Sequence, residues 1–163
     1  MAPCYREKEY HHLQYAMLKL GHEVSCMRAR LMLDRIATGG LSPSGLFWSI
    51  YFNGRWGPSR NNSGAYQHMW MPADGAFFFQ KAIALERDRG REHPKWEKAV
   101  ISNLDAFTKL WTKHRDFGWW VDRETLAIVR PGTAAAALYI GGLALGAKLP
   151  RGDEYLAVAR DAA

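Results

Sequence analysis

Two stretches of this chain, DGAFFFQKAIALE at residues 74–86 and TAAAALYIGGLALGAKL at residues 133–149, are apolar nearly all the way round a helix. A helix without a polar face has to be covered on all sides, whereas a helix with one polar face covers a core from outside. The stretch PKWEKAVISNLDAFTKLWTKHRD at residues 94–116 is of the second kind, because its apolar residues recur at helical spacing. The alternation of the two kinds predicts an inner and an outer layer of helices.

Length and composition bound the class of protein. The 163 residues suffice for one domain with a substantial core, and an apolar fraction of 48% excludes a disordered chain. No apolar run reaches the roughly 18 residues of a membrane span, and the charged N-terminus lacks the pattern of a signal peptide. We therefore expect no membrane partner and, by default, a cytoplasmic location. The net charge of +6 is scattered rather than gathered in a basic run, so it does not predict a nucleic-acid partner.

The periodicity of the apolar residues predicts six helices whose connections are alternately short and long. Glycine stops and a proline start place them at residues 9–20, 23–38, 74–89, 94–116, 133–149 and 153–163. Short turns join these helices in consecutive pairs, as in αα-hairpins, whereas residues 39–73 and 117–132 form long loops. In an up-down arrangement both long loops lie at the same end of the bundle. In the second helix we expect the inward-facing residues to be Val24, Met27, Leu31 and Ile36.

Both long loops carry the pattern of a small β-hairpin. LFWSIYF at residues 46–52 leads into Asn53-Gly54, the strongest two-residue turn signal, and then into Arg55-Trp56. FGWWVDRETLAIV at residues 117–129 predicts two short strands around a turn. The predicted fold class is therefore all-α, with three αα-hairpins and small β-hairpin loops on one rim.

The two ends of the chain predict an open architecture. The chain begins near a helix and ends at Ala163 inside another, with no polar capping unit. Three helical hairpins form an arc with an apolar edge at each end, and helical repeats normally cover such edges with polar terminal units. We therefore expect residues 1–163 to be a partial domain, incomplete at the C-terminus and open to extension at the N-terminus. If the chain is complete, we expect self-association through the open helical edges.

Three segments resemble internal stretches of (α/α)6-toroid glycoside hydrolases, the six-hairpin glycosidase superfamily of bacterial polysaccharide-degrading enzymes. They are GLSPSGLFWSIYFNGRWG at 40–57, MPADGAFFFQKAIALE at 71–86 and DFGWWVDRETLAIVRPGTAAAALYIGGLALGAK at 116–148. The resemblance implies an inner and an outer ring of six helices each, of which this chain supplies about half. It also implies a sugar-binding cleft at the end that bears the long loops. The function it implies is hydrolysis of a polysaccharide or oligosaccharide, with a uronate-containing sugar as one option.

Aromatic residues gather in or beside the two long loops. Flat aromatic rings stack on the apolar faces of sugars, although strands also favour aromatic residues simply to pack a hairpin onto a core. Arginines beside these rings can hold a uronate carboxylate with two parallel hydrogen bonds. The predicted substrate-binding residues are Trp48, Tyr51, Arg55, Trp56, His68, Trp70, Trp119, Trp120 and Glu124.

The carboxylates on the same rim predict the catalytic pair. Glycoside hydrolysis needs a proton donor and a base or nucleophile with carboxyl groups about 5 to 9 Å apart. Asp74 opens a predicted inner helix and Asp122 lies in the second hairpin, so we predict these two as the pair. The alternatives are an ordinary helix N-cap for Asp74 and a turn former for Asp122.

Other functions remain open on the same residues. A polysaccharide lyase on this scaffold would use Tyr66 with His68 and Asn61 to remove a proton from a uronate. A non-enzymatic helical-repeat module would bind a peptide in its groove. We expect no metal ion and no cofactor, because no metal-ligand spacing or phosphate-binding glycine loop occurs; the adjacent His11 and His12 are expected on different sides of a helix.

Overall fold

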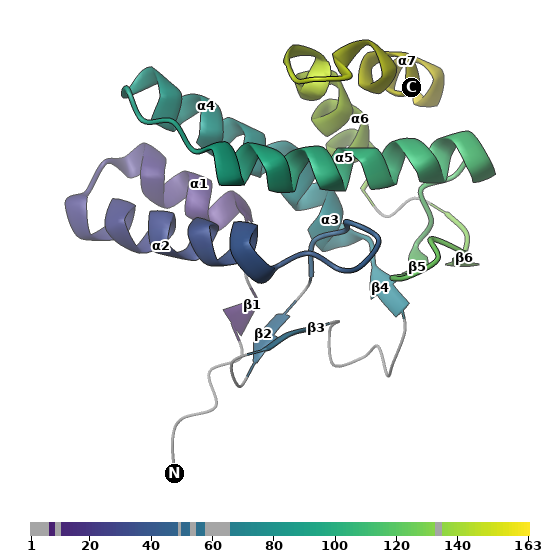
Figure 1. Ribbon diagram of the computed structural model, residues 1–163, viewed down its shortest axis with the longest axis horizontal. Coiled ribbons are helices and arrows are strands. Elements are labelled where there is room, and N and C mark those ends of the chain that lie inside the picture. Colours follow the sequence, from purple (N-terminus) through teal and green to yellow (C-terminus); the bar gives the residue numbers. More distant parts are fainter. Residues whose placement is uncertain (1–6, 9–10, 49, 53–54, 58–65, 133–134) are drawn as a thin grey trace.

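The computed structural model describes residues 7–8, 11–48, 50–52, 55–57, 66–132 and 135–163 (Figure 1). This part of the chain is mainly α-helical, as predicted. Its α-helices are α1 (His11–Leu20), α2 (Glu23–Gly39), α3 (Trp70–Asp74), α4 (Gln80–Asp88), α5 (Pro94–His114), α6 (Ala136–Leu145) and α7 (Gly152–Ala162). A π-helical segment, η1 (Gly75–Phe79), joins α3 to α4, and a short 3₁₀ segment, η2 (Gly146–Lys148), follows α6.

Short antiparallel strands form two sheets below the helices in Figure 1. The first sheet has the order β1-β2-β3, and the second has the order β4-β5-β6. Their bounds are β1 (Glu7–Lys8), β2 (Ile50–Phe52), β3 (Arg55–Gly57), β4 (Tyr66–His68), β5 (Trp120–Asp122) and β6 (Ile128–Arg130). The predicted hairpin strands are present in β2–β3 and β5–β6, whereas β1 and β4 were not predicted. The Asn53-Gly54 turn lies outside the described residues.

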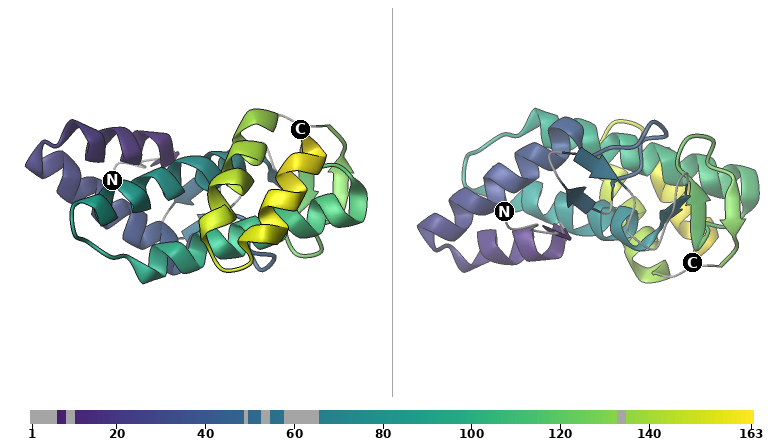
Figure 2. Two further views of the ribbon diagram at one scale, coloured as in Figure 1. Left: turned by 90° about the horizontal axis from the view of Figure 1, so that it is seen from above. Right: turned by 90° about the horizontal axis from the view of Figure 1, so that it is seen from below.

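The third predicted helix begins earlier than its sequence pattern indicates. Trp70 starts α3, and the helical path continues through η1 into α4 as far as Asp88. Figure 2 shows α1 and α2 at one end of the bundle and α6 and α7 at the other, with the α3–η1–α4 segment between them. This segment packs against α1, α5 and α6, as expected for a helix without a polar face.

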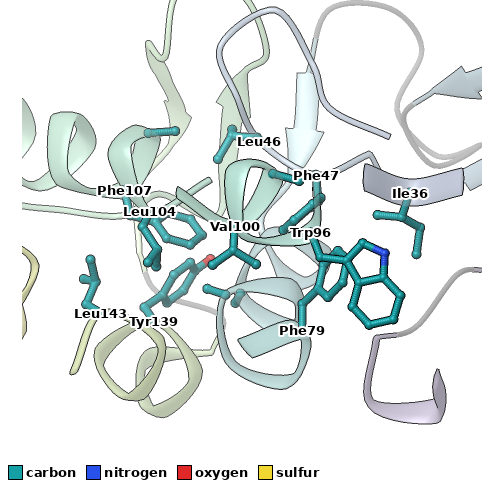
Figure 3. Packing of buried hydrophobic residues seen from close by; sticks show 14 of the residues in the cluster. Ile36, Leu46, Phe47, Phe79, Trp96, Val100, Leu104, Phe107, Tyr139 and Leu143 are labelled. Carbon is teal, nitrogen blue, oxygen red and sulfur yellow. The ribbon is translucent and has the colours of Figure 1, made fainter. Parts of the chain in front are cut away.

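The core is built around η1 and the side of α5 that faces it (Figure 3). Gly141 and Gly142 allow α6 to lie close to η1. A Cβ on Gly141 would meet the ring of Phe77 at 2.9 Å, and a Cβ on Gly142 would meet the Cβ of Ala76 at 2.7 Å. Gln80 then donates a hydrogen bond to the carbonyl of Gly142 at 2.7 Å. Tyr139 of α6 is fully buried and donates to the carbonyl of Met69 at 2.9 Å, which ties α6 to the start of α3.

The inward face of α2 differs from the prediction. Val24, Met27 and Leu31 are exposed, and only Ile36 of the four predicted residues is buried. The core takes the opposite side of the helix, where Cys26, Ala29 and Leu33 are buried. Small side chains on that side allow α2 to pack closely, so the broader apolar stripe remains at the surface.

The two long loops contact each other, as expected. The amide of Ser44 donates to the carbonyl of Arg123 at 3.2 Å, and the guanidinium of Arg123 lies over the ring of Trp48, 5.2 Å from its centroid. No helix in the described ranges is long and apolar enough to cross a membrane.

Candidate functional site

One face of the second sheet gathers aromatic and ionisable side chains. Directly paired residues of an antiparallel sheet point to the same side. Tyr66 pairs with Asp122, and His68 pairs with Trp120, which in turn pairs with Arg130. These five residues therefore share one face of the sheet.

The opposite face of this sheet is closed. Gln67 and Val121, which lie between the paired residues named above, are fully buried. One side of the sheet therefore packs against the core, and the other side faces away from the core. We use the name aromatic face for Tyr66, His68 and Trp120 of this side, together with Trp119, whose ring contacts His68, and the exposed Trp70 that begins α3 after β4.

His68 lies at the centre of the aromatic face. Its ring meets the ring of Trp119 at 5.5 Å and 90°, and the ring of Trp120 at 4.9 Å and 78°. Its Nδ1 accepts a hydrogen bond from the backbone amide of Trp70 at 3.2 Å. Burial lowers the pKa of His68 below its ordinary value, so the ring is neutral near pH 7. Because Nδ1 is an acceptor, the proton of the neutral ring is on Nε2, which is a hydrogen-bond donor.

The rim of the aromatic face is exposed. Tyr66 and Trp70 are both exposed large side chains. Arg130 is exposed as well, and its guanidinium lies 5.5 Å from the centroid of the Trp119 ring. An arginine held on an indole in this way presents a positive charge beside the flat surfaces. The face therefore combines stacking surfaces with one neutral donor and one cation.

Asp122 forms the turn between β5 and β6. Its Oδ1 accepts hydrogen bonds from the amide of Glu124 at 2.9 Å, the amide of Thr125 at 2.8 Å and the hydroxyl of Thr125 at 2.9 Å. These bonds, with those from the backbone of Thr125 and Glu124 foremost, lower the pKa of Asp122. The turn-forming role considered from the sequence is therefore present, and the carboxylate is ionised at neutral pH. Glu124 itself is exposed.

Asp74 does not open a helix, because four helical residues of α3 precede it. Its side chain is only 1% exposed. One oxygen, Oδ2, accepts from Nδ1 of His11 at 3.3 Å and from the amide of His12 at 3.2 Å, and Oδ1 accepts from Nδ1 of His12 at 2.6 Å. Burial raises the pKa of Asp74, but the bonds from His11 and His12 outweigh burial and lower it. The N-cap alternative is therefore wrong, and Asp74 is a buried, ionised acceptor.

Two of the predicted substrate-binding residues belong to a separate hollow on the first sheet. Tyr51 and Trp56 are paired across β2 and β3 with ring centroids 5.0 Å apart. The guanidinium of Arg35 lies 4.9 Å from the centroid of Tyr51. The hollow has a volume of about 390 Å³ and is lined by Leu31, Asp34, Arg35, Thr38, Gly39, Tyr51 and Trp56. Arg55 is exposed on the same sheet.

The predicted residues thus form two groups. His68, Trp70, Trp119 and Trp120 come together with Asp122 beside them, whereas Tyr51 and Trp56 face α2. Trp48 is bound to Arg123 of the β5–β6 turn. The hydrogen bonds of Asp74 and Asp122 go to different segments, so their catalytic pairing remains a prediction.

Sequence reasoning missed His12 and Arg130. Adjacent histidines were expected on different sides of a helix, yet both rings reach one carboxylate. They can do so because Asp74 faces the first turn of α1, where the amide of His12 is also unpaired within the helix. Within the described ranges, no three histidine, cysteine or acidic side chains are grouped so as to hold a metal ion.

Comparison with known proteins adds no relative to this description. No family model, no curated protein and no solved structure matches the chain. Its function has to be inferred from the residues themselves.

Proposed function

We propose that this protein is carbohydrate-active and that a saccharide chain lies against the aromatic face. The observation that carries the proposal is the arrangement of His68 with Trp119 and Trp120, flanked by exposed Trp70 and Tyr66. Indole and phenol rings offer flat apolar surfaces to the C–H faces of sugars, and a few polar groups among them fix orientation. Here the polar groups are the neutral His68 and the cationic Arg130.

The proposed reaction is hydrolysis of a glycosidic bond on a scaffold that is part of an (α/α) toroid. Two features support the toroid: consecutive helices pack in pairs, and the α3–η1–α4 segment is covered on several sides. Asp122 is an ionised carboxylate beside the face, and its bonds to the turn use Oδ1, which leaves Oδ2 as the oxygen that can act as base or nucleophile. The pKa values of Asp74 and Asp122 are both lowered, so both carboxylates are ionised at neutral pH in the unliganded protein.

A uronate elimination is the second candidate, and one juxtaposition favours it. Tyr66, His68 and Arg130 share the face of the sheet, and an exposed arginine is suited to pair with a uronate carboxylate. The Nε2–H of His68 would donate a hydrogen bond to the same carboxylate. Asn61, the third residue considered for this reaction, lies outside the described residues.

Calorimetric titration with two soluble probes, cellohexaose and hexagalacturonate, tests the proposal. Stacking that removes about 50 Å² of apolar surface contributes about 1.3 kcal/mol, or nearly tenfold in Kd. We expect Trp70→Ala and Trp120→Ala each to weaken binding of one probe about tenfold. Trp111→Phe, which changes a ring on α5 whose Nε1–H donates to Asp161 of α7, should leave Kd unchanged.

The products distinguish the two reactions. New reducing ends without ultraviolet absorbance indicate hydrolysis, whereas the conjugated double bond of an unsaturated uronate indicates elimination. Binding of neither probe, or binding that is indifferent to both tryptophan substitutions, would contradict the proposed function. Binding without either product would indicate a saccharide-binding protein without hydrolase or lyase activity.

A further inference from the structure

An apolar stripe lies exposed along α2. Val24, Met27 and Leu31 recur at helical spacing, so their side chains lie on one side of the helix. They are large hydrophobic side chains, yet they are 44%, 59% and 61% exposed. We call these three residues the α2 stripe. Single exposed apolar residues are ordinary, whereas a group of them on one surface marks a site of association.

Two more apolar side chains are exposed on the same helical hairpin. Leu13 and Leu20 belong to α1, which packs against α2, and they are 49% and 79% exposed. With the α2 stripe they expose on the order of 400 Å² of apolar surface, judged from their exposed fractions. A standard protein interface takes about 800 Å² from each partner, a little over half of it apolar. The hairpin therefore carries about the apolar area that one such interface needs.

Charged side chains flank the α2 stripe and are sorted by sign. At about 3.6 residues per turn, Glu23 and Asp34 lie along one side of the stripe, and Arg28 and Arg35 lie along the other. All four residues are exposed. Within the described ranges, neither Glu23 nor Arg28 forms an ion pair. The stripe therefore has an acidic edge and a basic edge, each with one charge that is not compensated there.

The other charged groups near the stripe are engaged within one copy of the chain. Arg30 donates two hydrogen bonds to the buried carboxylate of Glu86. Asp34 accepts a hydrogen bond from Nε1 of Trp96 at 2.7 Å. The guanidinium of Arg35 lies over an aromatic ring of the first sheet, 4.9 Å from its centroid. The acid and the arginine nearest the start of the stripe are therefore the charges that a neighbouring molecule would meet first.

This distribution of charge is complementary to itself. When two identical helices meet stripe to stripe and run in the same direction, the left edge of one lies against the right edge of the other, as in a parallel coiled coil. Glu23 of each copy then lies beside Arg28 of the other, five residues further along. In an antiparallel pair, edges of like sign would meet. A two-fold interface requires such self-complementarity, because one surface serves both copies.

We propose that two copies of this chain associate through α2. The α2 stripe forms the apolar centre of the interface, and a Glu23–Arg28 ion pair closes it on each side. The self-association expected from the open helical edges is thereby assigned to one helix and one relative direction. The inference does not rest on saccharide binding, so the two proposals succeed or fail separately.

Sedimentation velocity of the full chain over a series of concentrations tests the apolar centre. We expect a dimer that dissociates on dilution. Met27→Glu places a carboxylate in the centre of the interface and should weaken the dimer at least tenfold. Because Met27 is exposed in a single copy, the circular dichroism spectrum should keep its helical shape. The matched control is Leu145→Glu on α6, at the other end of the bundle (Figure 2), which should leave the dimer intact.

Charge reversal tests whether the partner is a second copy. Glu23→Arg and Arg28→Glu each disrupt two ion pairs per dimer and should each weaken association about tenfold. An equimolar mixture of the two variants restores both pairs in a mixed dimer, which should form about as tightly as the native one. A native protein that stays monomeric at every concentration would overturn the inference. So would a dimer that survives Met27→Glu or is lost in Leu145→Glu, or a mixture that associates no more tightly than its components.

Discussion

Replacement of Asp74 by asparagine should destabilise the protein by a predictable amount. The carboxylate accepts three hydrogen bonds, from His11 Nδ1, the His12 amide and His12 Nδ1. The asparagine side chain keeps one acceptor oxygen and brings an NH₂ group against a neighbouring donor. Leaving one buried donor without an acceptor costs about 1–3 kcal/mol. We therefore expect a loss of about 2 kcal/mol at neutral pH, which lowers Tm by about 4–8 °C in a domain of this size.

The loss of stability in Asp74→Asn should depend on pH. Because the pKa of Asp74 in the folded protein lies below its ordinary value of 3.8, the carboxylate stabilises the fold fully above that value. That contribution is lost as the pH falls through the lower folded value. The difference in Tm between the native protein and Asp74→Asn should therefore be largest at neutral pH and shrink in acid.

Thermal unfolding followed by circular dichroism measures both effects. Asp88→Asn is the control, since Asp88 is an exposed residue at the end of α4; its Tm should stay within about 1 °C of the native value. Equal Tm values for the native protein and Asp74→Asn at neutral pH would refute the buried acceptor, and so would a difference that widens in acid.

Three further substitutions test other parts of the structure. Gly75→Ala should destabilise the protein by about 1–3 kcal/mol because the added methyl group meets the buried ring of Phe47. Gly57→Ala is the control and should be nearly neutral, because no atom lies within 4 Å of the added carbon; equal losses in Tm would contradict the close contact at Gly75. Glu86→Gln should destabilise the protein by about 2–4 kcal/mol at neutral pH and by less in acid, because this buried side chain accepts two hydrogen bonds from Arg30 and its pKa is lowered despite burial. Urea denaturation at several pH values measures the loss in stability, and a loss that does not depend on pH would exclude the ion pair. Asp122→Asn retains the acceptor of the turn, so Tm should change by less than about 3 °C while turnover falls at least tenfold; unchanged turnover would leave Asp122 only its turn-forming role.

Local patterns predicted most of the secondary structure. The stop at Gly21 and the proline start at Pro94 agree with the ends of α1 and the start of α5. The hairpin signals in both long loops correspond to β2–β3 and β5–β6. These signals act over a few residues, so a single sequence contains them in full.

Features that depend on partners distant in the chain were not predictable. β1 and β4 each have three or fewer residues and exist because β2 and β5 pair with them. The buried side of α2 depends on which neighbours the helix meets, and the small Ala29 lies inside while the larger Leu31 lies outside. Periodicity alone gives the width of an apolar stripe but not the part of it that is covered.

In the candidate site, too, only the features with local sequence signals were predictable. Aromatic composition in the long loops indicated the tryptophans of the aromatic face, because composition and spacing are local. The role of Asp74 depended on His11 and His12, which are more than sixty residues away in the chain. No spacing rule connects such residues, so the hydrogen bonds between Asp74 and these two histidines were visible only once the fold brought α1 and α3 together.

Saccharide titration followed by nuclear magnetic resonance of the indole N–H groups tests the aromatic face most directly. Trp96 is an internal control, because it is fully buried and its Nε1–H donates to Asp34 at 2.7 Å. Saturation with a bound hexasaccharide should shift the indole signals of Trp70, Trp119 and Trp120 and leave that of Trp96 in place. Shifts confined to the indoles outside this sheet, or no shift at saturating saccharide, would contradict binding at the aromatic face.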